Sequence, residues 1–289
     1  MTEKHALAVP AVVGVLGGGR MGAGIAHAFL LAGARVTVVE RDGQAAEAAR
    51  ERIERDLAKS LERGGVDGNL DEWAENLTVS LDHADFADCE LVVEAVPESW
   101  DLKVAALQEV ERHLAETAWL ATNTSSLSVD GLAEQLGRPE RFCGLHFFNP
   151  VPSSQLVEVV NSKHTGVELR RLAVQWVEGL GKTAVVVNDS PGFASSRLGV
   201  VIALEAIRMV EEGVAAAADI DNAMVLGYKF PVGPLALTDI VGLDVRLGIA
   251  EYLASELGER FAPPQLMRDM VARGELGRKT GRGFFTYDQ

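Results

Sequence analysis

A short apolar run that passes directly into a glycine cluster constrains the fold of this chain most. The run Val-Val-Gly-Val-Leu occupies residues 12–16, and Gly-Gly-Gly-Arg-Met-Gly follows at residues 17–22. Apolar residues then recur at helical spacing over residues 25–32, and a second β-branched run over residues 36–39 ends at Glu40. This order predicts a strand, a glycine turn, a helix and a second strand, which is one unit of a parallel sheet.

The spacing G-x-G-x-x-G in this turn predicts a dinucleotide-binding site. Its glycines permit a tight turn, close approach of the backbone to a pyrophosphate and close packing of the helix, while the helix N-terminus offers N–H groups to the phosphates. An ordinary strand-to-helix turn is the alternative. We expect the cofactor to contact the residues of the turn and of the first helical positions: Gly17, Gly19, Arg20, Met21 and Gly22.

The acid at the end of the second strand bears on the choice of cofactor. Glu40 would accept hydrogen bonds from an adenosine ribose and repel a 2′-phosphate, which favours NAD. Its neighbour Arg41 could meet a phosphate, so NADP remains the alternative.

The alternation of strands and helices continues along the first two thirds of the chain. Strands are predicted at residues 77–81, 91–96 and 119–122, which indicates an α/β fold with a doubly wound parallel sheet of the Rossmann type. Near residues 188–192 the pattern changes to helices, predicted at residues 195–212, 219–226 and 241–257. We therefore expect two domains: residues 1–189, which bind NAD and carry the catalytic pair, and residues 190–289, which are all-α.

Polar residues follow several of the predicted strands, where open parallel sheets bind ligands. Glu98, Asn123 and Ser125 lie just past strand ends, and Lys103 follows Glu98 by about one helical turn. An exposed ion pair is the alternative for Glu98 and Lys103, and capping of the helix near Val129 is the alternative for the serine. The strand-end residues Ala95 and Val96 are also expected to contact the cofactor.

The segment from residue 142 to residue 160 carries one imidazole and one carboxylate. His146 ends one apolar run, Glu158 lies inside the next, and Pro152 is equidistant from both. If the two runs pair as strands, His146 faces Glu158, whose carboxylate would fix the imidazole tautomer and raise its basicity. A histidine that is satisfied within the core is the alternative.

Composition excludes several classes of protein. The net charge of −15 and a pI near 4.9 argue against nucleic acid or an anionic membrane as a partner. Cys89 and Cys143 both lie in apolar segments, so a reducing compartment is expected rather than a disulfide framework. Residues 1–5 do not read as the start of a secretory leader, no apolar run is long enough to span a bilayer, and the cytoplasm is the expected location. We expect no metal site.

Six motifs, in order along nearly the whole chain, resemble the 3-hydroxyacyl-CoA dehydrogenases. They are the glycine motif at residues 17–26, Asn-Thr-Ser-Ser-Leu at 123–127, His-Phe-Phe-Asn-Pro-Val-Pro at 146–152, Leu-Val-Glu-Val at 156–159, Pro-Gly-Phe at 191–193 and Gly-Arg-Lys-Thr-Gly-Arg-Gly-Phe at 277–284. The length is similar to that of the short stand-alone members that act on 3-hydroxybutyryl-CoA.

The resemblance implies a role for each site residue. His146 would be the general base for oxidation and Glu158 its partner, Ser125 would bind the substrate oxygen, and Asn123 and Asn149 would line the nicotinamide end. Glu98 and Lys103 would lie near the nicotinamide ribose. The helical domain would close over an acyl-CoA substrate and form a homodimer.

Three positions depart from the family pattern. Ser196 stands where the family commonly has Asn, Ser153-Ser154-Gln155 stands where many members have apolar residues and a Lys, and Glu40 replaces the more usual Asp. The first two bear on the acyl or thioester carrier, so a dehydrogenase of a free 3-hydroxy acid remains an alternative. A non-catalytic NAD-binding structural protein is the alternative from another class.

Overall fold

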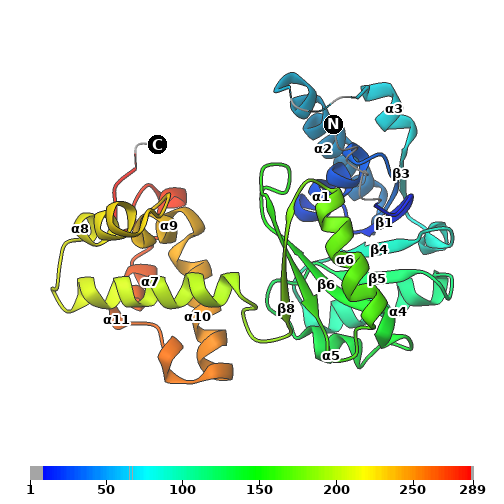
Figure 1. Cartoon of the computed structure of the whole chain (residues 1–289). Coiled ribbons are helices and arrows are strands. Elements are labelled where there is room, and N and C mark those ends of the chain that lie inside the picture. The colour runs from blue at the N-terminus through cyan, green and yellow to red at the C-terminus, as the bar shows by residue number, and fades with distance from the viewer. Residues whose placement is uncertain (1–8, 65, 67, 288–289) are drawn as a thin grey trace, which may run out of the picture. The chain divides into compact units, whose positions relative to one another are not determined.

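The computed structural model describes residues 9–64, 66 and 68–287, which form two compact units (Figure 1). The first unit ends at Ser190 and the second begins at Pro191. Residues 1–5, on which the expectation about a leader rests, lie outside the described residues. Cys89 and Cys143 are both buried free thiols, as the composition predicts.

An eight-stranded sheet forms the centre of the first unit, in the order β3-β2-β1-β4-β5-β6-β7-β8. Strands β1 to β6 run parallel, whereas β7 pairs antiparallel with β6 and parallel with β8. The strands are β1 (Val12–Leu16), β2 (Arg35–Val39), β3 (Leu77–Ser80), β4 (Leu91–Glu94), β5 (Trp119–Thr122), β6 (Phe142–Phe147), β7 (Leu156–Asn161) and β8 (Thr183–Asn188).

Helices cover both faces of this sheet, which confirms the doubly wound α/β class (Figure 1). On one face, side chains of α1, α2 and α6 share a core with alternate residues of the strands, among them Cys143, Leu145 and Phe147 of β6. Because successive strand residues point to opposite faces, His146 belongs to the other face, where Gly144 contacts α5. The helices are α1 (Arg20–Leu31), α2 (Gly43–Glu62), α3 (Leu70–Glu75), α4 (Trp100–His113), α5 (Val129–Ala133) and α6 (Val167–Gly179).

The second unit is built from helices, as predicted, but it has more of them than the three expected. Its helices are α7 (Ser195–Glu211), α8 (Ala217–Asn222), α9 (Pro234–Val241), α10 (Leu243–Leu257) and α11 (Gln265–Ala272). The prediction of one helix over residues 241–257 was wrong at its start. Gly242 adopts a φ of 104°, which separates α9 from α10.

Two buried aspartates connect the elements of this unit. Asp221, from α8, accepts hydrogen bonds from the N–H groups of Leu235 and Ala236 at 2.8 Å each, so it caps the N-terminus of α9. Asp239, from α9, accepts from Phe284 N, Phe285 N and Tyr287 Oη at 2.9–3.0 Å. These bonds hold the glycine-rich C-terminal segment against the helical core, as its aromatic residues predict.

The glycine turn gives a test of the fold. A Cβ on Gly22 would lie 1.7 Å from the carbonyl oxygen of Gly17, whereas a Cβ on Gly19 would meet no described atom within 4 Å. We expect Gly22→Ala to lower the free energy of unfolding by about 2 kcal/mol or more, because β1 and α1 must move apart. Urea denaturation measures this, and Gly19→Ala is the matched control that should unfold like the wild type. Equal stability of the two variants would contradict this packing.

Candidate active site

The glycine turn lies at the carboxyl end of β1 and leads into α1. Gly17 adopts a φ of 89°, and Gly19 is the exposed residue before the first helical turn, which Arg20 and Met21 begin. The N–H groups at the N-terminus of α1, together with the space above Gly19, provide a surface that fits a pyrophosphate.

Two side chains hold this turn: Glu40, and Arg52 of α2, which the sequence analysis did not single out. The Glu40 Oε1 atom accepts a hydrogen bond from Gly18 N at 2.7 Å, and Arg52 Nη1, from α2, donates to Gly18 O at 2.8 Å. Arg41, which raised the alternative of NADP, donates instead to its neighbour Asp42 at 3.0 Å. Glu40 is therefore placed beside the glycine turn, at the end of β2.

His146 and Glu158 form a buried pair on the antiparallel strands β6 and β7. The register sets the two residues opposite each other, as predicted, and His146 Nδ1 lies 2.8 Å from Glu158 Oε2. His146 is 6% exposed and Glu158 is fully buried. The carboxylate fixes the ring so that Nε2 is the nitrogen that can exchange a proton with a substrate.

Asn123 links this pair to the end of β5. Its Oδ1 atom accepts a hydrogen bond from Phe147 N at 2.9 Å, one residue after the histidine. The ring of Phe148 packs on the imidazole at 4.4 Å between centroids. These contacts hold the backbone just after the histidine and the face of its ring.

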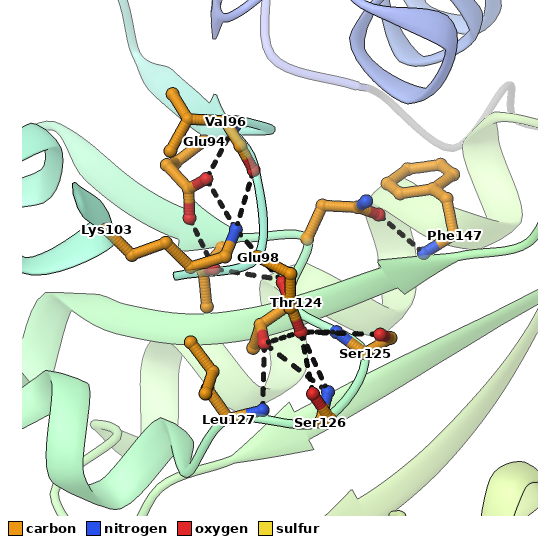
Figure 2. A network of polar contacts seen from close by, with 11 residues as sticks. Glu94, Val96, Glu98, Lys103, Thr124, Ser125, Ser126, Leu127 and Phe147 are labelled. Atoms are coloured by element: carbon orange, nitrogen blue, oxygen red, sulfur yellow. Dashed lines mark hydrogen bonds and ion pairs between the residues drawn. The ribbon is translucent and has the colours of Figure 1, made fainter. Parts of the chain in front are cut away.

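A second buried network lies at the carboxyl ends of β4 and β5 (Figure 2). Lys103 is 1% exposed, and its Nζ atom donates to Glu94 Oε1 at 2.7 Å and to Val96 O at 3.2 Å. Glu94, fully buried, also accepts from Val96 N at 2.7 Å and from Thr122 Oγ1 at 2.6 Å. Lys103 is therefore held by strand β4, and the exposed ion pair that we considered for it is wrong.

Glu98 connects this network to the polar loop after β5 (Figure 2). Its Oε2 atom lies 3.4 Å from Lys103 Nζ, while its Oε1 accepts hydrogen bonds from Thr124 Oγ1 at 2.6 Å and from the N–H groups and hydroxyls of Ser125 and Ser126. Burial alone would raise the pKa of Glu98, but the Thr124 bond, the charge of Lys103 and the serine bonds outweigh it and lower that pKa. Glu98 is thus kept ionised and fixes the loop that carries Ser125.

The helix-capping role that we considered for Ser125 belongs to Ser128 instead. Ser128 Oγ accepts from Gly131 N at 3.0 Å and caps α5, whereas the Ser125 hydroxyl faces Glu98. Sequence reasoning also missed Glu94, which lies within an apolar run and was taken only as part of a strand. An acid inside such a run, followed by a lysine nine residues later, is the signal that could have revealed it.

The remaining predicted residues lie at the edges of these networks. Ala95 and Val96 are half-buried in the turn after β4, and Asn149 is exposed in the loop after β6. The loop before Gln155 is held by Lys182, whose Nζ atom donates to Val151 O and Ser154 O at 2.8 and 2.5 Å. Ser196 lies in the first turn of α7, in the second unit.

The described residues lack the features of two other classes of site. No group of three or more His, Cys, Asp or Glu side chains among them could hold a metal ion. No helix in the described part of the chain is long and apolar enough to cross a membrane.

Comparison with known proteins identifies the family. Residues 12–190 match the NAD-binding domain of 3-hydroxyacyl-CoA dehydrogenase, and residues 192–287 match its C-terminal domain. A probable 3-hydroxybutyryl-CoA dehydrogenase of Deinococcus radiodurans is 41% identical over 95% of this chain and 99% of that protein, and a 3-hydroxybutyryl-CoA dehydrogenase of Mycobacterium tuberculosis is 41% identical over 95% and 98%. The crystal structure of (S)-3-hydroxybutyryl-CoA dehydrogenase from Ralstonia eutropha superposes with a TM-score of 0.92 at 35% identity, over 97% of this chain and all of that one. The chain therefore belongs to the 3-hydroxyacyl-CoA dehydrogenase family, and it is an NAD-dependent oxidoreductase.

Proposed function

We propose that the chain oxidises short-chain (S)-3-hydroxyacyl-CoA, with 3-hydroxybutyryl-CoA as its substrate, reversibly to the 3-oxoacyl-CoA. The observation that carries this proposal is the 2.8 Å contact of His146 with Glu158 beside strand ends in a dinucleotide-binding unit. The relatives from Deinococcus, Mycobacterium and Ralstonia, all named as 3-hydroxybutyryl-CoA dehydrogenases, support this choice of substrate.

The cofactor site is assigned from the residues of the glycine turn and the strand ends. NAD, when bound, supplies the acceptor for the hydride that leaves C3 of the substrate. Gly17, Gly19, Arg20, Met21 and Gly22 would hold its pyrophosphate, and Glu40 its adenosine ribose. The nicotinamide end would be lined by Ala95, Val96, Glu98, Lys103, Asn123 and Asn149.

His146 would transfer the proton. As the C3–H electron pair leaves with the hydride, the hydroxyl proton passes to His146 Nε2 and a C=O bond forms. The Glu158 carboxylate stabilises the imidazolium that results, because the pair is buried and water screens it little. In the reverse direction the imidazolium returns the proton to the same oxygen.

Ser125 and Ser196 would contact the substrate. The Ser125 hydroxyl, which donates its single proton to Glu98 in this structure, would turn that proton toward the oxygen on C3, and Ser196 of α7 would offer one hydroxyl to the acyl-CoA. The first unit, residues 1–189 in our assignment, thus supplies the cofactor site and the acid–base pair. The helical unit, residues 190–289, would close over the substrate.

The helical unit also supports a homodimer. Large apolar side chains are exposed on several of its segments: Leu198 at 60%, Leu226 at 68%, Tyr228 at 75%, Ile240 at 45% and Val245 at 46%. Exposed apolar surface of this kind marks an interface, and a second copy would cover it. The two free thiols favour a reducing compartment, and we propose the cytoplasm.

Replacement of His146 tests the reaction. We expect His146→Ala to lower kcat for acetoacetyl-CoA reduction by about 10²- to 10⁴-fold, since general acid–base catalysis contributes this much, with the Kd for NADH unchanged. NADH oxidation followed at 340 nm and fluorescence titration measure the two quantities. The control is His164→Ala, which removes an exposed histidine and should leave kcat unchanged. A His146→Ala enzyme with wild-type turnover would refute the assignment, and a wild type that reduces free acetoacetate but not its CoA thioester would refute the substrate.

Replacement of Glu40 tests the cofactor assignment. Glu40→Gln keeps an acceptor for Gly18 N but removes the charge that would repel a 2′-phosphate. We expect the ratio of kcat/KM for NADPH to that for NADH to rise about tenfold or more. The exposed Glu47→Gln, on α2, should leave the ratio unchanged. An unchanged ratio in Glu40→Gln would remove Glu40 from the cofactor site.

Replacement of Glu94 tests a positioning residue. Glu94→Gln keeps the shape of the side chain but leaves the buried Lys103 ammonium without its nearest carboxylate. We expect kcat/KM to fall by about tenfold to 100-fold, mainly through a higher KM for NADH, because Lys103 and Val96 shift. The matched control is Glu90→Gln just before β4, where the Glu90 carboxylate accepts an exposed hydrogen bond from Ala11 N at 3.1 Å. Lower stability with unchanged KM in Glu94→Gln would indicate a purely structural role.

A further inference from the structure

Thr124, in the polar loop after β5, carries a buried hydroxyl whose direction is fixed by its surroundings (Figure 2). The residue is 1% exposed. Its Oγ1 atom accepts hydrogen bonds from Leu127 N at 3.0 Å and Ser126 N at 3.4 Å, and it donates to Glu98 Oε1 at 2.6 Å. A hydroxyl has one proton and two lone pairs, so these bonds use all that it can offer. The proton of Thr124 is therefore committed to Glu98.

The Oε1 atom of Glu98 faces more donors than it can accept at one time. Besides Thr124, the donors within reach are Ser125 N at 2.9 Å, Ser126 Oγ at 3.0 Å, Ser126 N at 3.1 Å and Ser125 Oγ at 3.3 Å. A carboxylate has about four lone-pair sites over its two oxygens, so one oxygen cannot hold all of these donors. Backbone N–H groups cannot turn away, whereas a serine hydroxyl can rotate. The Ser125 hydroxyl, at the longest distance, is the donor that Glu98 holds least.

We propose that Thr124 is a positioning residue for the reaction: its hydroxyl occupies Glu98 Oε1 and so leaves the Ser125 proton available to the oxygen on C3 of the substrate. The proposal rests on the proposed function, in which Ser125 contacts that oxygen. Without the Thr124 hydroxyl, Oε1 loses its shortest bond and the Ser125 hydroxyl bonds to it more tightly. The substrate then competes for this proton with an ionised carboxylate, which is a stronger acceptor than a neutral oxygen.

A purely structural role for Thr124 is the alternative, because its Oγ1 atom also accepts from the backbone of the loop. Thr165, which follows β7, provides a matched comparison. It is 3% exposed, and its Oγ1 atom donates to Phe142 O at 2.8 Å and accepts from Ser162 N at 2.9 Å. Its hydroxyl thus donates to a backbone carbonyl where that of Thr124 donates to a carboxylate. Thr165→Val therefore reports the cost of losing a buried threonine hydroxyl away from Glu98.

The test measures the rate of hydride transfer from NADH to acetoacetyl-CoA in a single turnover by stopped flow. We expect Thr124→Val to lower this rate by about tenfold to 100-fold, with the Kd for NADH unchanged, because a hydrogen bond to the reacting oxygen is weakened. Thr124→Ser, which keeps the hydroxyl, should retain most of the rate, and Thr165→Val should react like the wild type. Circular dichroism establishes that each variant is folded, and Thr124→Ala repeats the test if the valine variant is not.

A double-mutant cycle with Ser125→Ala separates the two roles of Thr124. If Thr124 acts by releasing the Ser125 proton, Thr124→Val should lower the rate no further in the Ser125→Ala enzyme, which has no such proton. An equal loss in both backgrounds, a wild-type rate in Thr124→Val, or a loss in Thr124→Ser as large as in Thr124→Val would overturn the positioning role while leaving the dehydrogenase intact. A wild-type enzyme that reduces free acetoacetate but not its CoA thioester would overturn the proposed function instead.

Discussion

The hydrogen bond between His146 and Glu158 depends on the pairing of β6 with β7. The two strands run antiparallel, and a slip of one residue would turn each side chain to the opposite face of the sheet. The apolar residues that alternate with the pair, among them Leu145 and Val159, belong to the core under α1 and α6. The packing of the sheet and the geometry of the His146–Glu158 pair are therefore specified by the same strands.

Buried charged side chains have different kinds of partner in the two units. In the first, Glu94, Lys103 and Glu98 form a chain of contacts in which each charge faces an opposite one and every carboxylate accepts further hydrogen bonds. Such a network can be rigid without a large cost of desolvation. In the second, Asp221 and Asp239 are satisfied by backbone N–H groups. Arg246 of α10 differs from them: it is also buried, and its Nε atom makes no hydrogen bond among the described residues.

Much of the fold followed from the sequence because its signals are local. The apolar runs of β1 and β2, the glycine turn and the symmetry about Pro152 specify strands, a turn and a register without knowledge of distant contacts. The helices α9 and α11 were missed because each is only eight residues long and begins at a proline, Pro234 or Pro264, which reads as a turn in the sequence. Glu94 and Lys103 were missed as a buried pair because their burial depends on packing of α4 on the sheet. The sequence located Glu98 and Ser125 at strand ends, but it did not reveal that they contact each other, because that contact depends on the conformation of the loop after β5.

The central claim is that Glu158 acts on the reaction through His146. Its most direct test is the rate of hydride transfer in a single turnover, measured by stopped flow with NADH and acetoacetyl-CoA in the Glu158→Gln enzyme. Because an amide cannot stabilise the imidazolium as a carboxylate does, we predict a rate about 100-fold or more below that of the wild type, with NADH binding unchanged. A wild-type rate of hydride transfer in this variant would contradict the account.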